Sequence, residues 1–245
     1  MSGSAHGRPS VVVPTYDERE TIEQLLGQLL EDERGYQVLV VDDGSPDGTG
    51  ELVAALAATE PRIRLLQRER KSGLGDAYRA GFQVALGTDA TVICQMDADL
   101  SHDPRALGAL VDAVAGGADL AVGSRYVAGG DVTGWSWQRV ALSRAANLFA
   151  RAVTGCPVRD MTAGFRAWSA TGLQRIEVAT TRSQGYAFQI EMTLRARTAG
   201  LRIVERPIAF VERTAGRSKL TGAVGREALR MVLRWGWALR RGRPL

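Results

Sequence analysis

The segment Val38–Thr49, VLVVDDGSPDGT, decides the fold class of this 245-residue chain. Four apolar residues, Val38–Val41, are followed directly by two aspartates and then by a Gly-Ser-Pro-Asp-Gly turn. A short apolar run that ends in turn-forming residues is typical of a strand buried on both faces of a parallel sheet. The segment contains neither G-x-G-x-x-G nor G-x-x-x-x-G-K-[ST], which argues against an NAD-binding fold and against a P-loop.

Apolar runs and helical patterns alternate on both sides of this segment. Further strands are expected at Ser10–Pro14, Ile63–Leu66, Thr91–Met96 and Leu120–Val122, and later at Leu201–Val204 and Pro207–Val211. Helices are expected at Glu18–Leu30, Thr49–Ala58, Gly75–Leu86, Pro104–Ala115, Gln138–Val153, Tyr186–Thr198 and Gly222–Leu239. The sequence therefore predicts an α/β fold, a mostly parallel, twisted sheet with helices on both faces. Ligands of such sheets collect at the carboxyl ends of the strands.

Composition and charge exclude several classes of protein. Apolar residues make up 45% and charged residues 24% of the chain, which is ordinary for a globular domain and excludes collagen, coiled coil and general disorder. The net charge is +4, but residues 226–245 carry six arginines and one glutamate, a sum of +5. The rest of the chain is thus near neutral, which argues against a nucleic-acid partner. Nucleotidyltransferases are disfavoured as well. They usually have a Gly-rich loop with Arg or Lys after the first strand, whereas this loop reads PTYDE.

The basic C-terminal stretch also carries tryptophans, a combination that suits the headgroup region of a membrane. A core-packing helix with a basic outer face is the alternative. The chain has two cysteines and no apolar run of 18 residues, and its polar, Gly/Ser-rich start leads us to expect no signal peptide. We therefore expect a cytoplasmic protein that associates peripherally with the cytoplasmic face of the membrane.

Two pairs of carboxylates follow predicted strands. One of Asp42 and Asp43 could hydrogen-bond a base or ribose, although acids in such a loop also cap the next helix. Asp97 and Asp99 lie in the run MDADLSHDP, and alternate residues of an extended segment point the same way. Their oxygens suit Mg²⁺ or Mn²⁺ bridged to a diphosphate, while a solvated loop is the alternative.

Cationic side chains suggest phosphate sites. Arg125 ends the fifth predicted strand, and Arg139 and Ser143 share one face of the following predicted helix. A solvated helix face is the alternative for that pair. The chain has 29 arginines and two lysines, and one of the lysines, Lys219, lies in a glycine-containing loop that could fold over an anionic ligand.

The order of VVVPTYDERETI, VLVVDDGSPDGT, MDADLSHDP, GSRY, SRAAN and FVERTAGRSKL resembles the dolichyl- or polyprenyl-phosphate mannosyltransferases, over roughly residues 10–222. These are inverting glycosyltransferases with a nucleotide-sugar-binding α/β fold. The resemblance implies a flexible N-terminus at 1–9, a Rossmann-like donor-binding half at 10–125, an acceptor-binding half at 126–222 and a basic C-terminal helix at 223–245. It implies transfer of mannose from GDP-mannose to a polyprenyl phosphate, with Mg²⁺ or Mn²⁺ as cofactor.

The resemblance also implies roles for single residues. Those expected to bind the donor are Pro14, Tyr16, Glu18, Val41, Asp43, Asp97, Ala98, Asp99, Arg125, Arg213 and Lys219. Those expected to bind the metal are Asp97 and Asp99, and those expected to bind the acceptor phosphate are Arg125, Arg139 and Ser143. Asp99, Arg125 and Arg139 are implied to be catalytic. Ser101 stands where some members have a metal-contacting glutamine, so water could replace a third protein ligand.

No catalytic base is expected, because a lipid phosphate is mostly dianionic at neutral pH and needs charge compensation instead. Asp160 is expected to organise the acceptor loop. Two close alternatives stay open: a UDP-glucose-dependent polyprenyl-phosphate glucosyltransferase, and the same fold acting on a sugar hydroxyl. The basic tail could contact the membrane itself, or a separate membrane-anchoring protein could hold the enzyme there.

Overall fold

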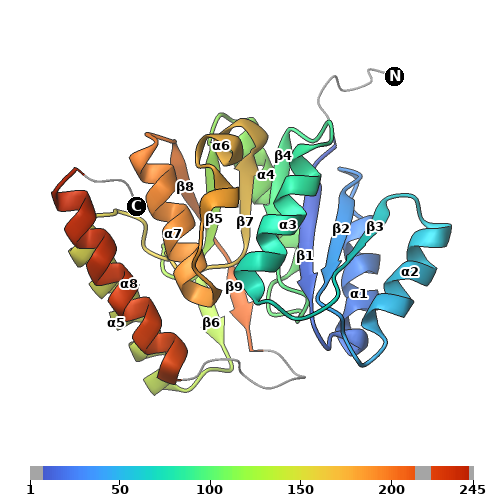
Figure 1. Ribbon diagram of the computed structural model, residues 1–245, viewed down its shortest axis with the longest axis horizontal. Coiled ribbons are helices and arrows are strands. Elements are labelled where there is room, and N and C mark those ends of the chain that lie inside the picture. Colours follow the sequence, from blue (N-terminus) through green and yellow to red (C-terminus); the bar gives the residue numbers. More distant parts are fainter. Residues whose placement is uncertain (1–7, 213–221, 243–245) are drawn as a thin grey trace.

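The computed structural model describes residues 8–212 and 222–242. Its centre is a seven-stranded sheet in the order β3-β2-β1-β4-β7-β5-β8 (Figure 1). The strands are β1 (Ser10–Thr15), β2 (Gln37–Asp42), β3 (Ile63–Gln67), β4 (Val92–Gln95), β5 (Leu120–Ser124), β7 (Arg166–Ser169) and β8 (Ile203–Pro207). All neighbours pair in parallel except β7, which is antiparallel to both β4 and β5. The predicted α/β fold with a mostly parallel sheet is confirmed.

Helices cover both faces of this sheet. On one face pack α1 (Arg19–Leu30), α2 (Thr49–Thr59) and α4 (Leu107–Ala115). On the other pack α3 (Leu74–Leu86), α6 (Ala170–Arg175) and α7 (Gly185–Thr198). A further layer lies outside α7, where α8 (Gly222–Arg240) contacts both α7 and α5 (Trp137–Thr154).

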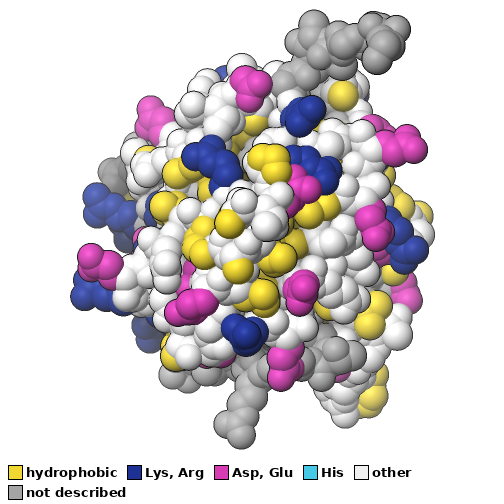
Figure 2. Space-filling view, turned by 90° about the vertical axis from the view of Figure 1, so that its right-hand side faces the viewer, with side chains coloured by type: hydrophobic (Ala, Val, Ile, Leu, Met, Phe, Trp, Pro, Cys, Tyr) yellow, Lys and Arg dark blue, Asp and Glu magenta, His cyan; other side chains and the backbone are white. Residues whose placement is uncertain are grey.

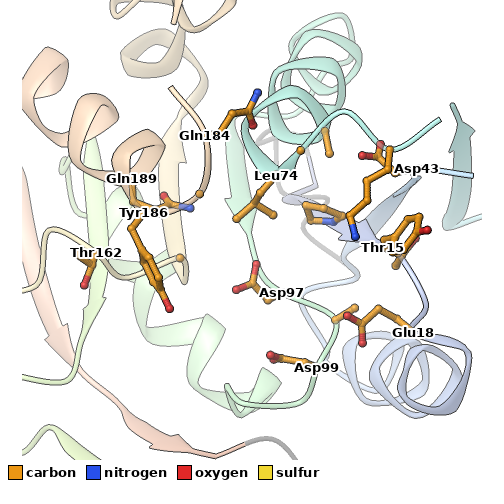
Figure 3. A pocket seen from close by; sticks show the side chains of 18 residues that line it. Thr15, Glu18, Asp43, Leu74, Asp97, Asp99, Thr162, Gln184, Tyr186 and Gln189 are labelled. Carbon is orange, nitrogen blue, oxygen red and sulfur yellow. The ribbon is translucent and has the colours of Figure 1, made fainter. Parts of the chain in front are cut away.

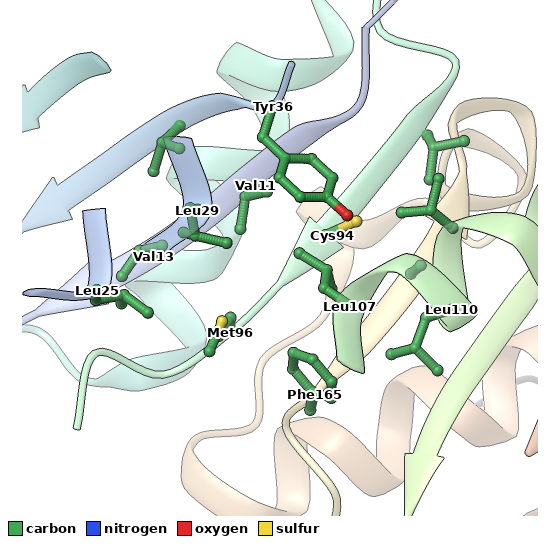
Figure 4. Close-up of a cluster of buried hydrophobic side chains, with 14 of the residues drawn as sticks. Val11, Val13, Leu25, Leu29, Tyr36, Cys94, Met96, Leu107, Leu110 and Phe165 are labelled. Atoms are coloured by element: carbon green, nitrogen blue, oxygen red, sulfur yellow. The ribbon is translucent and has the colours of Figure 1, made fainter. Parts of the chain in front are cut away.

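The alternation of side chains along β1 explains why two separate cores form. Val11 and Val13 point into the cluster under α1 and α4, which Figure 4 shows around Tyr36 and Leu107. Val12 points to the opposite face, toward α3 and α7. Because both faces of the strand are covered, its sequence is continuously apolar rather than alternating.

β7 was not expected from the sequence, because it begins with a charged residue. Arg166 is fully buried, and its guanidinium donates to the backbone oxygens of Ala163, Gln189 and Met161 at 2.8–3.0 Å. Burial lowers the pKa of Arg166 to about 10, so the side chain stays charged at neutral pH. Three carbonyl acceptors therefore make a buried arginine tolerable in a central strand.

Smaller elements also differ from the expectation. β9 (Ala209–Val211) does not join the large sheet but pairs in parallel with β6 (Asp131–Thr133). The helix expected at Pro104–Ala115 begins with a 3₁₀ turn at Pro104–Ala106, and a second such turn spans Val178–Thr180. Asp103, directly before Pro104, caps the first turn by accepting the backbone N–H of Arg105.

Within residues 8–212 and 222–242, no helix is both long and apolar enough to cross a membrane. Figure 2 shows the face of the molecule at the β3 edge of the sheet. Acidic and basic side chains are interspersed over it, the pattern of a solvated surface.

Candidate active site

The loops after β1, β2 and β4 meet at one edge of the sheet and form a cavity of about 380 Å³ (Figure 3). The opposite wall comes from the loop before β7 and from the first turns of α7. The residues that line this cavity are Pro14, Thr15, Tyr16, Glu18, Asp43, Lys71, Gly73, Leu74, Ala77, Asp97, Ala98, Asp99, Thr162, Gly164, Gln184, Gly185, Tyr186 and Gln189. The structure thus brings together seven of the predicted donor-binding residues that precede β5: Pro14, Tyr16, Glu18, Asp43, Asp97, Ala98 and Asp99.

The loop after β1 is held in an uncommon conformation. Asp17 has φ +58°, in the left-handed region that non-glycine residues rarely adopt. Its backbone N–H donates to Ser45 Oγ at 3.1 Å, which ties this loop to the loop after β2. The ammonium of Lys71 lies 3.6 Å from the centre of the Tyr16 ring, a cation–π contact at the mouth of the cavity.

The two aspartates after β2 have different roles. Asp42 is fully buried and accepts hydrogen bonds from Thr15 Oγ1 at 2.9 Å and from Ser45 Oγ at 2.5 Å, so it braces the loops. Asp43 lines the cavity and accepts from the Arg68 guanidinium at 2.7 Å and the Ser72 N–H at 3.1 Å. Asp43 is therefore the carboxylate that a ligand in the cavity can reach.

Asp97 and Asp99 follow β4 and lie at the centre of the site in Figure 3. Tyr78 donates its hydroxyl proton to Asp97 Oδ1 at 3.1 Å. Burial, reinforced by the charge of Asp97, raises the pKa of Tyr78 well above its ordinary value, so the hydroxyl remains a donor. Asp99 accepts the backbone N–H of Ser101 at 3.1 Å, around Leu100 with φ +57°. The strained backbone is the kind of feature that collects at functional sites.

The carboxylates of Asp97 and Asp99 are the type of ligand that a divalent cation prefers, but two carboxylates alone do not complete its coordination. Both carboxylates border the main cavity and a second, smaller one, and their hard oxygens match Mg²⁺ or Mn²⁺. Among the described residues, no group of three or more His, Cys, Asp or Glu side chains could hold a metal ion. An ion bound here would therefore complete its coordination with ligand oxygens or water, as the Ser101 departure suggested.

The second cavity, of about 100 Å³, adjoins the first at Asp97 and Asp99. Its cationic wall contains Arg125 and Arg139. Arg125 forms a two-pronged pair with Asp160, with both N–O distances 2.7 Å and side-chain exposures of 6% and 0%. Burial alone would raise the pKa of Asp160, but the hydrogen bonds and charge of Arg125 outweigh it and hold that pKa below its ordinary value. Asp160 is therefore engaged in orienting Arg125 rather than free to act as a base.

Arg139 lies near the start of α5, whose first turn is capped by Ser136. Its guanidinium pairs with Glu212 and sits 4.0 Å from the centre of the Trp135 ring, so the side chain is held at the cavity rim. Ser143 is one turn further along and accepts the Tyr126 hydroxyl proton at 2.6 Å. Ser143 does not line either of these two cavities, so the structure brings Arg125 and Arg139 to the predicted acceptor region without it.

Other predicted residues lie elsewhere. The side chain of Val41 is buried in the core under α3 rather than in the cavity lining. Arg213 and Lys219 fall outside the described residues. His102 is buried against the rings of Phe165 and Phe210, and burial lowers its pKa to about 4, so it is a neutral packing residue at pH 7.

The cavity wall formed by Thr162, Gln184, Tyr186 and Gln189 was not predicted from the sequence. Gln184 joins the two walls, because it accepts the N–H of Gly75 at 2.8 Å and donates to Asp76 at 2.9 Å. In the sequence these residues read as a loop and an ordinary helix start. The one available signal was the pair of polar residues, Gln189 and Glu191, inside an otherwise apolar helical stretch.

Comparison with known proteins identifies the family of this chain. The family model for glycosyl transferase family 2 matches residues 10–176. The polyprenol monophosphomannose synthase of Mycolicibacterium smegmatis is 46% identical over 230 residues, 94% of this chain and 87% of that protein. The undecaprenyl-phosphate mannosyltransferase of Micrococcus luteus is 45% identical over 95% of this chain and 96% of its own length.

A solved structure supports the fold. The glucosyl-3-phosphoglycerate synthase of Mycobacterium tuberculosis, in complex with Mn²⁺, UDP and glucosyl-3-phosphoglycerate, has a TM-score of 0.67 at 24% identity, covering 98% of this chain and 82% of that one. The resemblance found in the sequence motifs is thereby confirmed at the level of fold and family. This chain is a glycosyltransferase that belongs to glycosyl transferase family 2.

Proposed function

We propose that this chain transfers mannose from GDP-mannose to the phosphate of a polyprenyl lipid, with inversion at the sugar carbon. One observation carries the proposal: Asp97 and Asp99 lie between a nucleotide-sized cavity and a smaller cavity bordered by Arg125 and Arg139. The names of the two relatives above, which cover nearly the whole chain, point to the same donor sugar and acceptor class.

The donor would lie in the larger cavity. Asp43 and Tyr16 would lie near the nucleoside, and Asp97 and Asp99, which line the same cavity, would lie near the diphosphate. A cavity of about 380 Å³ is in the usual range for small-molecule sites. Asp97 and Asp99 would hold Mg²⁺ or Mn²⁺, whose positive charge would offset the charge that builds on the leaving diphosphate.

The acceptor phosphate would bind beside the two arginines. A lipid phosphate is largely dianionic at pH 7 and is already a nucleophile, so the site must attract and align it rather than deprotonate it. Arg125 is pre-oriented by Asp160, and Arg139 is fixed by Glu212 and Trp135. Such preorganised cations need little rearrangement when the phosphate arrives.

An assay that follows the transfer of radiolabelled sugar to a lipid extracted into organic solvent tests the proposal. The purified chain is mixed with Mg²⁺, a short-chain polyprenyl phosphate and radiolabelled GDP-mannose or UDP-glucose in parallel. We expect lipid-soluble counts from GDP-mannose. Counts from UDP-glucose alone would overturn the donor assignment. Transfer to a soluble sugar but not to the lipid phosphate would overturn the acceptor assignment.

Arg139→Gln is expected to raise KM for the lipid phosphate by about tenfold while KM for GDP-mannose changes less than twofold. The reason is the loss of one charge-assisted hydrogen bond to the acceptor, about 1.5 kcal/mol. Steady-state kinetics with each substrate varied in turn checks it, with Arg105→Gln, on an exposed surface pair, as the matched control. An equal rise in both KM values would contradict the acceptor role.

We also propose that α5 and α8, which lie side by side in Figure 1, form the membrane-facing surface. Exposed apolar side chains on this pair of helices are Trp137, Leu142, Leu148, Phe149, Leu229, Leu233 and Trp237. Exposed basic side chains on the same two helices are Arg144, Arg230, Arg234 and Arg240. Apolar anchors with a basic surround match an anionic leaflet, where each basic residue near the surface adds about 1 kcal/mol.

Leu233→Glu combined with Trp237→Glu should reduce the fraction of protein that floats with anionic vesicles by about tenfold, because it removes two apolar anchors and adds repulsive charge. Flotation on phosphatidylcholine vesicles with and without phosphatidylglycerol measures it. Ala55→Glu on α2 at the opposite end of the molecule is the control. If the wild type floats with neither kind of vesicle, the proposal that α5 and α8 contact the membrane directly is contradicted.

A further inference from the structure

Gln189, on α7, presents an unsatisfied hydrogen-bond donor to the main cavity. Its side chain is 2% exposed, yet Nε2 has no hydrogen-bond partner among the residues that the structure describes. Figure 3 shows Gln189 on the wall opposite Asp97 and beside Tyr186. A buried N–H without an acceptor costs free energy, so its retention at a cavity wall points to an acceptor that arrives with a ligand.

A relay of three side chains fixes which end of the amide faces the cavity. The Trp168 indole N–H donates to Gln95 Oε1 at 3.1 Å, and Gln95 Nε2 donates to Gln189 Oε1 at 2.8 Å. An indole can only donate, so Gln95 must turn its oxygen toward Trp168 and its NH₂ group toward Gln189. Gln189 must then keep its own oxygen toward Gln95 and its NH₂ group toward the cavity.

The space in front of this NH₂ group is shared with Asp97. A Cβ atom added at Gly164 would lie 3.3 Å from Asp97 Oδ2 and 3.6 Å from Gln189 Nε2. The missing side chain at residue 164 therefore keeps a narrow opening between the carboxylate and the amide. In Figure 3, Asp43 lies on one side of Asp97 and Gln189 on the other.

This order matches the order of groups in a nucleotide sugar. With the nucleoside near Asp43 and the diphosphate near Asp97, the group next in line is the hexose. We propose that Gln189 Nε2 donates a hydrogen bond to a hydroxyl oxygen of that hexose, and that Gln95 and Trp168 are positioning residues that hold the amide in the donating orientation. This inference rests on the proposed function, because it requires a nucleotide-sugar donor in the cavity.

Isothermal titration calorimetry tests the contact between Gln189 and the hexose. In the presence of Mn²⁺, the Kd for GDP is compared with the Kd for GDP-mannose. Gln189→Met keeps the length of the side chain and removes the donor. We expect Kd for GDP to stay within twofold of wild type and Kd for GDP-mannose to rise about five- to tenfold. Thr193→Val is the matched control, since Thr193 is buried one turn along α7 and bonds the backbone oxygen of Gln189. Gln95→Met should also raise the ratio of Kd for GDP-mannose to Kd for GDP, because the Gln189 amide is then free to turn.

Each other outcome has a distinct meaning. Equal weakening of GDP and GDP-mannose would overturn the sugar contact, and so would an unchanged ratio in Gln189→Met. An unchanged ratio in Gln95→Met alone would overturn the positioning relay. If the folded wild type binds neither ligand, the proposed function falls and takes this inference with it.

Discussion

Asp99→Asn is expected to lower kcat/KM for mannose transfer by about 10³-fold. The substitution removes one of the two negative charges that face both cavities, and a metal's stabilisation of a leaving diphosphate amounts to several kcal/mol. The fold of the loop should persist, because an asparagine oxygen can still accept the Ser101 N–H that Asp99 accepts now. Initial rates measured over a range of Mn²⁺ concentrations check both the loss and its metal dependence.

Asp103→Asn is the matched control for that variant. Asp103 lies four residues further along the same loop, but it is exposed and pairs with Arg105. We expect its rate to stay within twofold of wild type. An Asp99→Asn enzyme that keeps more than a tenth of wild-type activity, with the same metal dependence, would contradict the role given to the two carboxylates.

Asp160→Ala is expected to lower the free energy of unfolding by about 3–5 kcal/mol, because it leaves the charge of Arg125 buried without a carboxylate to balance it. Asp160 also accepts the backbone N–H of Arg125 at 3.1 Å, so the end of β5 loses an anchor as well. The pKa of Asp160 lies below its ordinary value, so the pair stabilises the fold at pH 7, and this contribution is lost as the pH falls below about 4. Urea unfolding followed by circular dichroism measures the change.

Two further variants separate the buried pair from an ordinary surface pair. Arg105→Ala should cost less than about 1 kcal/mol, since exposed ion pairs contribute little and the cap that Asp103 makes to the backbone N–H of residue 105 is kept. Replacing both partners, Arg125→Met with Asp160→Leu, should recover much of the lost stability, because no buried charge is left alone. The double variant should be inactive, since Arg125 borders the second cavity, where we propose that the acceptor phosphate binds. A loss below 1 kcal/mol in Asp160→Ala would contradict this account of the pair.

The part of the fold that could be predicted from sequence is the part built from continuous apolar strands. The VVV run of β1 and the VLVV run of β2 are apolar because both faces are covered, and that pattern is readable without a structure. β7 was hidden because Arg166 looks like a surface residue in sequence. Its burial depends on carbonyls of Met161, Ala163 and Gln189, which only the folded chain brings together.

The candidate site, too, could be predicted only in part from the sequence. The aspartates after β2 and β4 could be found because parallel strands bring their carboxyl ends to one edge. The α7 wall could not, because Gln95 and Gln189 are 94 residues apart and meet only after β7 inserts between β4 and β5. The pairing of Arg125 with Asp160 was also not derivable from spacing, although the position of Asp160 had suggested an organising role.

The structure of the product is the sharpest check, because an oxygen of the lipid phosphate is proposed to attack the sugar carbon on the face opposite the leaving diphosphate. The product made by the purified chain from GDP-α-mannose and polyprenyl phosphate is analysed by ³¹P and ¹H nuclear magnetic resonance. We expect a mannosyl phosphodiester with the β configuration at the anomeric carbon. A retained α configuration, or a glycosidic bond to a hydroxyl oxygen, would contradict it.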